Sequence, residues 1–345
     1  MQLNIHSRSL GRKRIFGAGK VLHNTLKGLA QIGVEVCFNE PIAKHNYTWI
    51  HDSPEAIIGA GFANRPVLVG PNTATTPRDL PRFRRPLHRD SIYLFPSAWA
   101  KAAWEGMGYA ECRRHVWAAG VDLEQFPSRK RFRSDPEHIL IYFKNRDERL
   151  LIEVESLVRA RGSSYEVFRY GSYQEDEYRA ALNRAQCAVW VGGTESQGFA
   201  LMEALASGLP LLVLDAVSLS DNVLDLNDPL VPKFPAAFVQ SGATTAPYFD
   251  ARCGMKVDAI ELSNEIFDRF LEKIEQYDPA SFVRERFSLD NAATELVTLA
   301  RMLRSPQTNK PIFYSALAKP LRYLDLAMRP WAWTLAVHKF LRSFK

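Results

Sequence analysis

Two glutamates, Glu195 and Glu203, are the side chains whose type and spacing most clearly indicate chemistry. An apolar run at 187–191 precedes them and predicts a buried parallel strand. The strand is followed by two glycines and then by a helix predicted to begin near Gly198, with a terminating Gly-Leu-Pro at 208–210. A helix that begins at a glycine after a strand offers unpaired N–H groups and a partial positive charge to an anion. The segment therefore predicts an anion-binding helix end between two carboxylates.

Two carboxylates beside a phosphate site would repel a ligand that carried only phosphate. They suit a ligand that also carries hydroxyl groups, because a carboxylate accepts hydrogen bonds from a vicinal diol. A phosphate group with diols on both sides describes a nucleotide sugar. The alternative is an ordinary amphipathic helix whose two glutamates, Glu195 and Glu203, are solvated.

The pattern Glu-x7-Glu with Gly198-Phe199 between the acids resembles the donor-site signature of GT-B glycosyltransferases, in particular the retaining enzymes of glycosyltransferase family 4. The resemblance implies that Glu195 faces the donor sugar as a catalytic residue. It also implies that the amides of Gly198 and Phe199 meet the sugar and the diphosphate, and that Glu203 holds the ribose. The implied fold is α/β GT-B: two Rossmann-like doubly wound domains that face each other across a cleft, followed by a C-terminal helical tail.

Cations follow a second predicted strand, 138–143. Ligands of open α/β sheets bind at the carboxyl ends of strands, so these cations are placed to meet a diphosphate. Family members carry an Arg and a Lys five positions apart here, and this chain has Lys144 and Arg149 at that spacing with the types exchanged. We expect Lys144 and Arg149 to be catalytic, with Arg146 as a further donor-binding cation. The alternative is a solvated charge run that opens a helix.

The N-terminal part of the chain begins with a strand at 2–6, a glycine-bearing loop, a helix at 20–31 and a strand at 34–38. This order is typical of a doubly wound α/β domain. Gly17-Ala-Gly19 lacks the third glycine of a dinucleotide fingerprint, and Lys20 is followed by Val21 rather than the Ser or Thr of a P-loop. The resemblance places Gly17 and Gly19 over the cleft, near acceptor and donor diphosphate. A tight turn is the alternative.

Four more residues are candidate cleft residues. Gly171 and Ser172 follow a predicted strand in a loop that, by the resemblance, borders the nucleotide base. His51, at a strand end, is the candidate base if the reaction inverts configuration. A plain turn also accounts for His51. Asn72, after another strand, is placed on the acceptor side by its position alone.

The segment Gly120-Val-Asp-Leu-Glu-Gln-Phe-Pro127 resembles the join between the two GT-B domains. We therefore predict an acceptor-side domain at 1–128, a nucleotide-sugar donor domain at 129–309 and a basic aromatic tail at 310–345. Amphipathic helices are predicted at 260–277 and 291–303. The stretch 217–254 is not assigned.

Composition agrees with a soluble globular protein, since 24% of the 345 residues are charged and 46% are apolar. The four cysteines are scattered, which predicts neither a zinc site nor disulfides and favours a reducing cytoplasm. No signal peptide or spanning apolar run is present in this sequence. The net charge of +6 resides entirely in 310–345, which argues against a general nucleic-acid binder.

The tail mixes tryptophans, tyrosines and phenylalanines with seven bases and one acid. Aromatic residues with a basic face fit a helix in the headgroup region of an anionic leaflet. The tail thus favours peripheral attachment to the inner face of the cell membrane. Packing of this segment against the N-terminal domain is the alternative.

The predicted activity is retaining transfer of a hexosyl or deoxyhexosyl group from a nucleoside diphosphate sugar to the hydroxyl of a glycan or lipid-linked acceptor. We expect it to act in the assembly of a surface polysaccharide or glycolipid. No cofactor and no metal are expected, because side-chain cations can neutralise the leaving diphosphate. Two alternatives stay open: another GT-B nucleotide-sugar enzyme, such as an epimerase or hydrolase, and a non-catalytic sugar-nucleotide-binding protein. The incomplete glycine fingerprint disfavours an NAD-dependent oxidoreductase.

Overall fold

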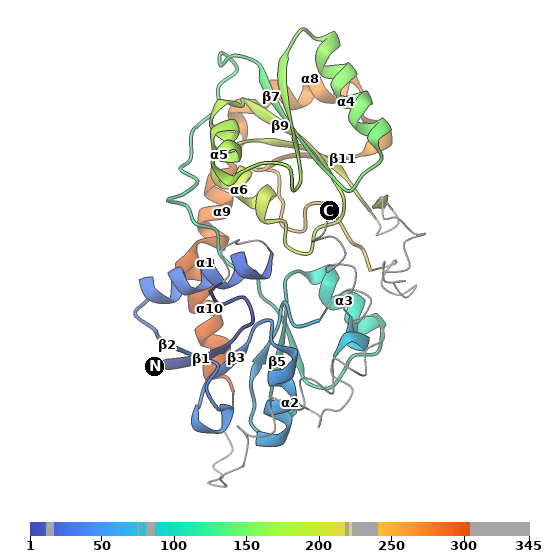
Figure 1. Ribbon diagram of the computed structural model, residues 1–345. Helices are drawn as coiled ribbons and strands as arrows, with labels where there is room; N and C mark the ends of the chain where they lie inside the picture. The colour runs from blue at the N-terminus through green and yellow to red at the C-terminus, as the bar shows by residue number, and fades with distance from the viewer. Residues whose placement is uncertain (12–16, 75, 81–86, 218–220, 223–240, 304–345) are drawn as a thin grey trace, which may run out of the picture.

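The computed structural model describes residues 1–11, 17–74, 76–80, 87–217, 221–222 and 241–303. They form two lobes, each built around its own parallel sheet, and the chain crosses between the lobes twice (Figure 1). The predicted tail, 310–345, and most of the unassigned stretch, 217–254, lie outside the described residues. No helix within the described ranges is long and apolar enough to cross a membrane.

The N-terminal lobe contains a six-stranded sheet in the order β2-β1-β3-β4-β5-β6, and every pairing is parallel. Helices cover both of its faces, because alternate strand residues point to opposite sides. Leu3 and Ile5 pack towards α1 and towards α10 (Leu289–Arg301), the last helix described, whereas Val69 and Tyr93 pack towards α2 and α3. The elements are β1 (Gln2–His6), α1 (Ala18–Gln31), β2 (Glu35–Phe38), β3 (Thr48–Ile50), α2 (Pro54–Ala63), β4 (Leu68–Val69), β5 (Ile92–Phe95), α3 (Ala98–Gly106) and β6 (Arg113–Val116).

The second lobe contains a five-stranded parallel sheet in the order β11-β10-β9-β7-β8. Ile141 and Val189 face α4 and α8, whereas Tyr142 and Trp190 face α5, α6 and α9. The elements are β7 (His138–Lys144), α4 (Glu148–Ala160), β8 (Ser164–Arg169), α5 (Glu175–Arg184), β9 (Cys187–Gly192), α6 (Phe199–Ala206), β10 (Leu211–Asp215), β11 (Gly254–Asp258), α8 (Asn264–Glu272) and α9 (Pro279–Phe287).

Each sheet has one point at which the strand order reverses. In the first lobe β1 lies between β2 and β3, and in the second β7 lies between β8 and β9. The connections from neighbouring strands leave in opposite directions at such a point, and a crevice forms at the carboxyl ends of the strands. The fold therefore places Lys144, at the end of β7, and Gly192, at the end of β9, on the edge of a crevice.

The two segments that cross between the lobes pair with each other. The amide of Val121 donates to the carbonyl of Phe287 at 2.7 Å, and Val121 and Ser288 form a parallel bridge. Gly120 leaves room for this approach, because a Cβ atom there would lie 2.8 Å from the Ser288 carbonyl oxygen. Asp122 accepts from Lys27 of α1 and from the side chain of Gln125. The Gly-Val-Asp segment is thus a close backbone crossing that ties both lobes together.

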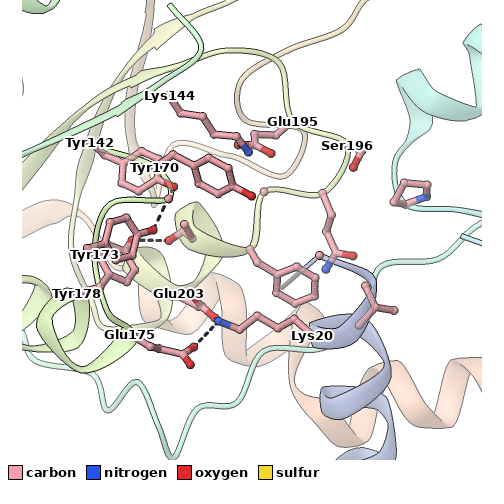
Figure 2. A pocket seen from close by; sticks show the side chains of 18 of the residues that line it. Lys20, Tyr142, Lys144, Tyr170, Tyr173, Glu175, Tyr178, Glu195, Ser196 and Glu203 are labelled. Atoms are coloured by element: carbon pink, nitrogen blue, oxygen red, sulfur yellow. Dashed lines mark hydrogen bonds and ion pairs between the residues drawn. The ribbon is translucent and has the colours of Figure 1, made fainter. Parts of the chain in front are cut away.

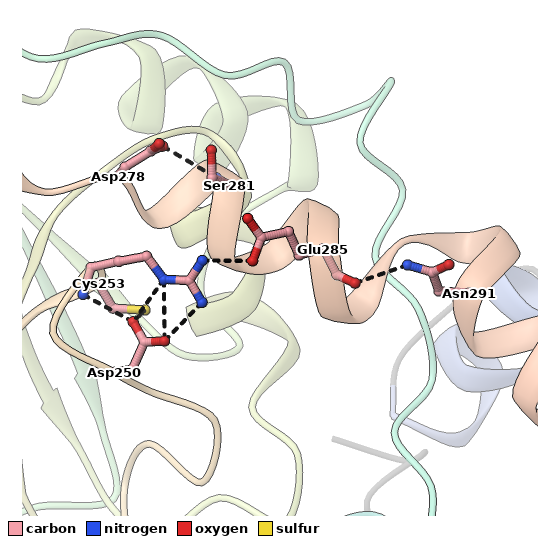
Figure 3. A network of polar contacts seen from close by, with 7 residues as sticks. Asp250, Cys253, Asp278, Ser281, Glu285 and Asn291 are labelled. Atoms are coloured by element: carbon pink, nitrogen blue, oxygen red, sulfur yellow. Dashed lines mark hydrogen bonds and ion pairs between the residues drawn. The ribbon is translucent and has the colours of Figure 1, made fainter.

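A polar network fixes α9, the helix that leads into the second crossing (Figure 3). Arg252 donates to both carboxylate oxygens of Asp250 and, at 2.7 Å, to Glu285 on α9. Asp278 caps the start of α9 by accepting from the Ser281 amide at 3.2 Å. Asn291 of α10 then donates to the Glu285 carbonyl at 3.0 Å, so the bend between the two helices is held from both sides.

The final described helix, α10, returns to the first lobe and packs against α1 (Figure 1). Gly28 is the closest point, since a Cβ there would lie 2.3 Å from the Leu289 carbonyl oxygen. Trp117 also donates to the Ala292 carbonyl at 3.0 Å. A segment from the predicted 129–309 domain therefore contributes to the core of the N-terminal lobe.

Most predicted elements occur, but several bounds differ. The helix predicted at 20–31 begins earlier, at Ala18, and the strand predicted at 34–38 begins at Glu35; β11 begins at the last residue of the unassigned stretch. The helix predicted at 260–277 is broken into α8 and two short 3-10 turns.

Replacing Gly28 with alanine is expected to reduce the free energy of unfolding by about 1–3 kcal/mol, because the new methyl group overpacks the α1–α10 contact. Glycine-to-alanine changes inside a helix usually stabilise by up to about 1 kcal/mol. A loss of stability in Gly28→Ala would therefore point to the tight α1–α10 contact. Denaturant unfolding of Gly28→Ala measures it. Ala30→Gly, on the exposed side of the same helix, is the control and costs at most about 1 kcal/mol. A stabilised Gly28→Ala protein would contradict the tight crossing.

Candidate active site

A cavity of about 720 Å³ lies between the lobes, at the crevice that the two sheets predict (Figure 2). Both lobes line it. The N-terminal lobe contributes Gly17, Lys20, Val21, Pro71, Asn72 and Pro96, and the second lobe contributes Tyr142, Lys144, Tyr170, Gly171, Tyr173, Gln174, Glu175, Tyr178, Glu195, Ser196, Gln197, Gly198, Phe199, Ala200 and Glu203.

The loop between β9 and α6 carries the first glutamate, and its backbone is fixed on the side of its own lobe. The Gly193 amide donates to the Lys144 carbonyl at 2.7 Å, and a Cβ on Gly193 would lie 2.4 Å from Asn222 Oδ1. The Glu195 amide donates to the Thr244 carbonyl at 3.0 Å. The close packing leaves no room for a side chain at 193, which explains the glycine there. The backbone hydrogen bonds hold Glu195 at the cavity.

The other lobe holds the same loop. The indole N–H of Trp99, on α3, donates to the Glu195 carbonyl at 2.9 Å. Gln197, which is 4% exposed, pairs with the backbone of Ala119 in both directions, at 3.1 and 2.7 Å. The position of Glu195 therefore depends on how the lobes meet.

Lys144 and Glu195 form an ion pair inside the cavity, with Nζ 2.6 Å from Oε1. Nζ also lies 4.1 Å from the centre of the Tyr170 ring, within range of a cation–π contact. Burial raises the pKa of Glu195, and Lys144 opposes that shift. The pair presents an ammonium group and a carboxylate to any ligand in the cavity.

Glu203 is paired with a lysine from the opposite lobe. The Nζ of Lys20 contacts Glu203 and lies 2.6 Å from Oε1 of Glu175 (Figure 2). Glu203 is 3% exposed, and burial raises its pKa to about 7 against the opposing effect of Lys20. This carboxylate is costly to bury and is held at the cavity wall by an ion pair between lobes.

Two helix N-termini face the cavity. α6 begins at Gly198, whose φ of 80° favours glycine, and α1 begins at Gly17; neither has a side-chain cap. The orphan N–H groups and the helix dipole of each end favour an anion. One end from each lobe, with Lys20 and Lys144 nearby, gives the cavity a positive centre between its carboxylates.

Tyrosines form the side of the cavity next to β7 and α5. The hydroxyl groups of Tyr142 and Tyr173 are 3.3 Å apart, and Tyr178 donates to the Ala200 carbonyl at 2.7 Å. Tyr142 also stacks on Trp190 with ring centres 4.0 Å apart. These contacts join the cavity wall to the lobe core, so this side of the site is rigid.

Comparison with solved structures identifies the architecture. Three resemble this chain over nearly their whole length. Sucrose-phosphate synthase from Thermosynechococcus elongatus has a TM-score of 0.50 at 10% identity, covering 87% of this chain and 98% of its own. The apo lipopolysaccharide outer core galactosyltransferase WaaB has 0.50 at 11%, covering 87% and 99%. Anabaena HepE, solved in complex with UDP, has 0.51 at 13%, covering 88% and 100%.

This chain has the GT-B fold. Identities of this size show the fold alone. No protein-family model matches the sequence, and no curated protein matches it. The two parallel sheets, the cavity between them and the structural matches together confirm the expected pair of Rossmann-like lobes facing across a cleft.

Within this GT-B cavity the structure brings together most of the residues predicted from sequence. They come from both lobes and from five separate chain segments. They are Gly17, Asn72, Lys144, Gly171, Glu195, Gly198, Phe199 and Glu203.

The arginines expected beside Lys144 do not line the cavity. The Arg149 side chain is 84% exposed and pairs with Asp147, the N-cap residue of α4, at 2.6 Å. Its place in the first turn of α4 directs it to the cap carboxylate, so the structure places Arg149 outside the cavity lining. Arg146 donates to the Gly192 carbonyl at 3.3 Å and is not among the lining residues.

Three further candidates also lie outside the lining. His51 is fully buried, and its Nε2 lies 2.8 Å from the Ala18 carbonyl oxygen. Burial lowers the pKa of His51, and the structure places this side chain against the start of α1, outside the cavity lining. Gly19 lies within the first turn of α1, and Ser172 lines a separate groove beside β8.

Sequence reasoning missed Lys20, Trp99 and Gln197. Lys20 follows Gly17-Ala-Gly19, and the P-loop motif, which it does not complete, is the only local pattern that would indicate a role for it. The indole of Trp99 and the amide of Gln197 carry no spacing signal, because their partners are backbone groups distant in sequence.

One group of possible metal ligands, Cys37, Glu40 and His45, occurs in the part of the chain that the structure describes. The thiol lies 3.8 Å from Nδ1 of His45, and Glu40 lies 2.9 Å from Nε2 of the same ring. None of the three lines the cavity, so the group bears no relation to the chemistry proposed below.

Replacing Glu203 with glutamine is expected to change how stability depends on pH. The carboxyl group has a pKa of about 7 in the folded chain, against an ordinary value of 4.5. Folding therefore opposes its ionisation, and its contribution to stability is lost as pH rises from about 4.5 through about 7. Relative to wild type, Glu203→Gln should gain up to about 3 kcal/mol across that interval. Unfolding measured at several pH values tests this, and parallel pH profiles would contradict it.

Proposed function

We propose that this chain is a glycosyltransferase that moves a sugar from a nucleoside diphosphate to an acceptor hydroxyl. The observation that carries the proposal is the inter-lobe cavity, where Glu195 and Glu203 lie beside Lys144, Lys20 and two uncapped helix ends. A nucleotide sugar offers diols for the carboxylates and a diphosphate for the positive groups. The GT-B relatives include HepE, whose solved complex contains UDP, and this supports a nucleotide ligand.

The arrangement of groups supports one orientation of the donor. Glu203 is the acceptor for the ribose hydroxyls, and Glu195 faces the sugar. The diphosphate then lies between the start of α6 at Gly198 and the Lys144 ammonium, and the base lies towards the loop that contains Tyr170 and Gly171. Asn72, exposed on the opposite lobe, lines the acceptor side.

Catalysis in this proposal is mainly stabilisation of the leaving diphosphate. Negative charge develops on the phosphate oxygen as the bond to the sugar breaks, and preorganised donors lower the barrier. Lys144 and the α6 N–H groups supply those donors from one rigid lobe. Because these groups carry the positive charge, the proposed mechanism requires no metal ion.

We favour retention of configuration at the sugar. The described lining residues of the N-terminal lobe include no carboxylate and no histidine, and His51 is enclosed beneath α1. An inverting reaction needs a base on the acceptor side, whereas in a retaining one the leaving phosphate takes the acceptor proton. The lining therefore supports the retaining course.

The proposed acceptor is a glycan or lipid-linked sugar in surface polysaccharide or glycolipid assembly. Its support is the sequence of 310–345, whose aromatic residues and net charge of +6 suit the surface of an anionic leaflet. A transferase held there by its tail would meet an acceptor anchored in the same membrane.

Lys144→Met and Glu195→Gln are expected to separate binding from transfer. Loss of the ammonium should weaken nucleoside diphosphate binding roughly tenfold to hundredfold. Glu195→Gln removes a carboxylate from beside the phosphate site, so nucleoside diphosphate binding should be kept. Transfer should fall roughly 10²–10³-fold in both variants.

Calorimetry with UDP, GDP, ADP and dTDP measures binding, and release of nucleoside diphosphate from the matching sugars in the presence of lipid extract measures transfer. Lys101→Met, a surface lysine on α3 paired with Glu105, is the matched control and should resemble wild type. Failure of the wild-type protein to bind any of these compounds would contradict the proposal.

Neutralising the tail is expected to release the protein from membranes. In the full chain, Lys339→Gln with Arg342→Gln and Lys345→Gln removes half of the net charge of +6. Each base near an anionic surface is worth about 1 kcal/mol, so partitioning should fall by roughly two orders of magnitude. Sedimentation with vesicles that contain phosphatidylserine measures this, and neutral vesicles are the control. Equal binding by both proteins would contradict the proposed attachment.

A further inference from the structure

Lys20 forms an ion pair with Glu203, the carboxylate that the proposed donor needs for its ribose. It is in the first turn of α1, in the N-terminal lobe, yet its Nζ contacts Glu203 and Glu175 of the other lobe (Figure 2). The lysine side chain is only 17% exposed and also passes 5.7 Å from the centre of the Phe126 ring. Lys20 is thus an ordered part of the cavity wall and not a solvated surface lysine.

The charges around Lys20 leave it cationic. Burial lowers the pKa of the ammonium group, but the carboxylates of Glu203 and Glu175 outweigh burial and raise it overall. Two acids and one base leave the cluster with an excess negative charge if both acids are ionised. A phosphate group entering the cavity would therefore meet an ammonium that is already shared between two acids.

The Glu203 carboxylate cannot bind Lys20 and a ribose diol fully at the same time. Glu203 is 3% exposed, and its contact with Lys20 is made through Oε1. A vicinal diol binds a carboxylate best when both oxygens are free to accept. Ribose binding at Glu203 therefore competes with Lys20 for that oxygen. A flexible four-carbon stem allows the ammonium to move away only if another anion receives it.

That second anion is a phosphate group. Lys20 lies one turn from Gly17, the uncapped start of α1, and this helix end faces the same cavity as the start of α6. The inference rests on the proposed function. We propose that Lys20 is a specificity-determining residue that blocks the ribose acceptor Glu203 until a diphosphate draws the ammonium away. Binding of the ribose thus becomes conditional on phosphate, and the site discriminates nucleotides from nucleosides.

The experiment compares two ligands in two variants of the full chain. The probe pair is whichever of UDP, GDP or ADP binds wild type most tightly, together with its own nucleoside; dTDP is left out because its deoxyribose lacks the vicinal diol. Calorimetry is done at about pH 8.5, above the pKa of about 7 for Glu203. Lys20→Met keeps the length and packing of the side chain but removes its charge. Lys27→Met is the matched control, since Lys27 is on the same helix and also pairs with an acid, Asp122, outside it.

Lys20→Met should bind the nucleoside about tenfold more tightly than wild type, and the nucleoside diphosphate about tenfold or more weakly. Lys27→Met should leave the ratio of the two affinities at its wild-type value. Equal changes for both ligands in Lys20→Met, or no change for either, would show that Lys20 only ties the lobes and would overturn the inference while leaving the proposed function intact. Failure of wild type to bind any of the four diphosphates, dTDP included, would instead overturn both.

Discussion

The proposed chemistry depends on two buried carboxylates in the cavity, each of which is paired with a lysine. Glu195 pairs with Lys144 of its own lobe, and Glu203 pairs with Lys20 of the opposite lobe. An unpaired charge at either position would carry a desolvation penalty that folding does not tolerate well. The second pair also spans the lobes, so the charge balance at Glu203 depends on how the two lobes are placed relative to each other.

Contacts of the backbone and of uncharged side chains hold the two lobes together. The crossing segments pair at Val121 and Ser288, α10 returns to pack on α1, and Gln197 holds the Ala119 backbone. These contacts fix α1 relative to the β9–α6 loop, and hence Lys20 relative to Glu203. The positions of the charged groups in the site are therefore set by contacts between uncharged groups.

Sequence predicted the parts of the site that depend on local pattern. The strand–glycine–helix order from 187 to 208 fixed the start of α6, and the placement of Glu195, Gly198 and Glu203 at one cavity follows from it. Arg149 lies outside the cavity lining because the nearby cap carboxylate of Asp147 binds its side chain, and sequence spacing gives no information on the rotamer. Lys20 was missed because its partners are more than a hundred residues away, where only the tertiary fold brings them.

A structure of the full chain with a bound nucleoside diphosphate sugar tests the central claim most directly. The account predicts density for the diphosphate between the start of α6 and Lys144, with the ribose hydroxyls on Glu203 and the Lys20 ammonium moved from that carboxylate to phosphate. A nucleotide bound outside the cavity, or one whose ribose faces away from Glu203, would contradict it.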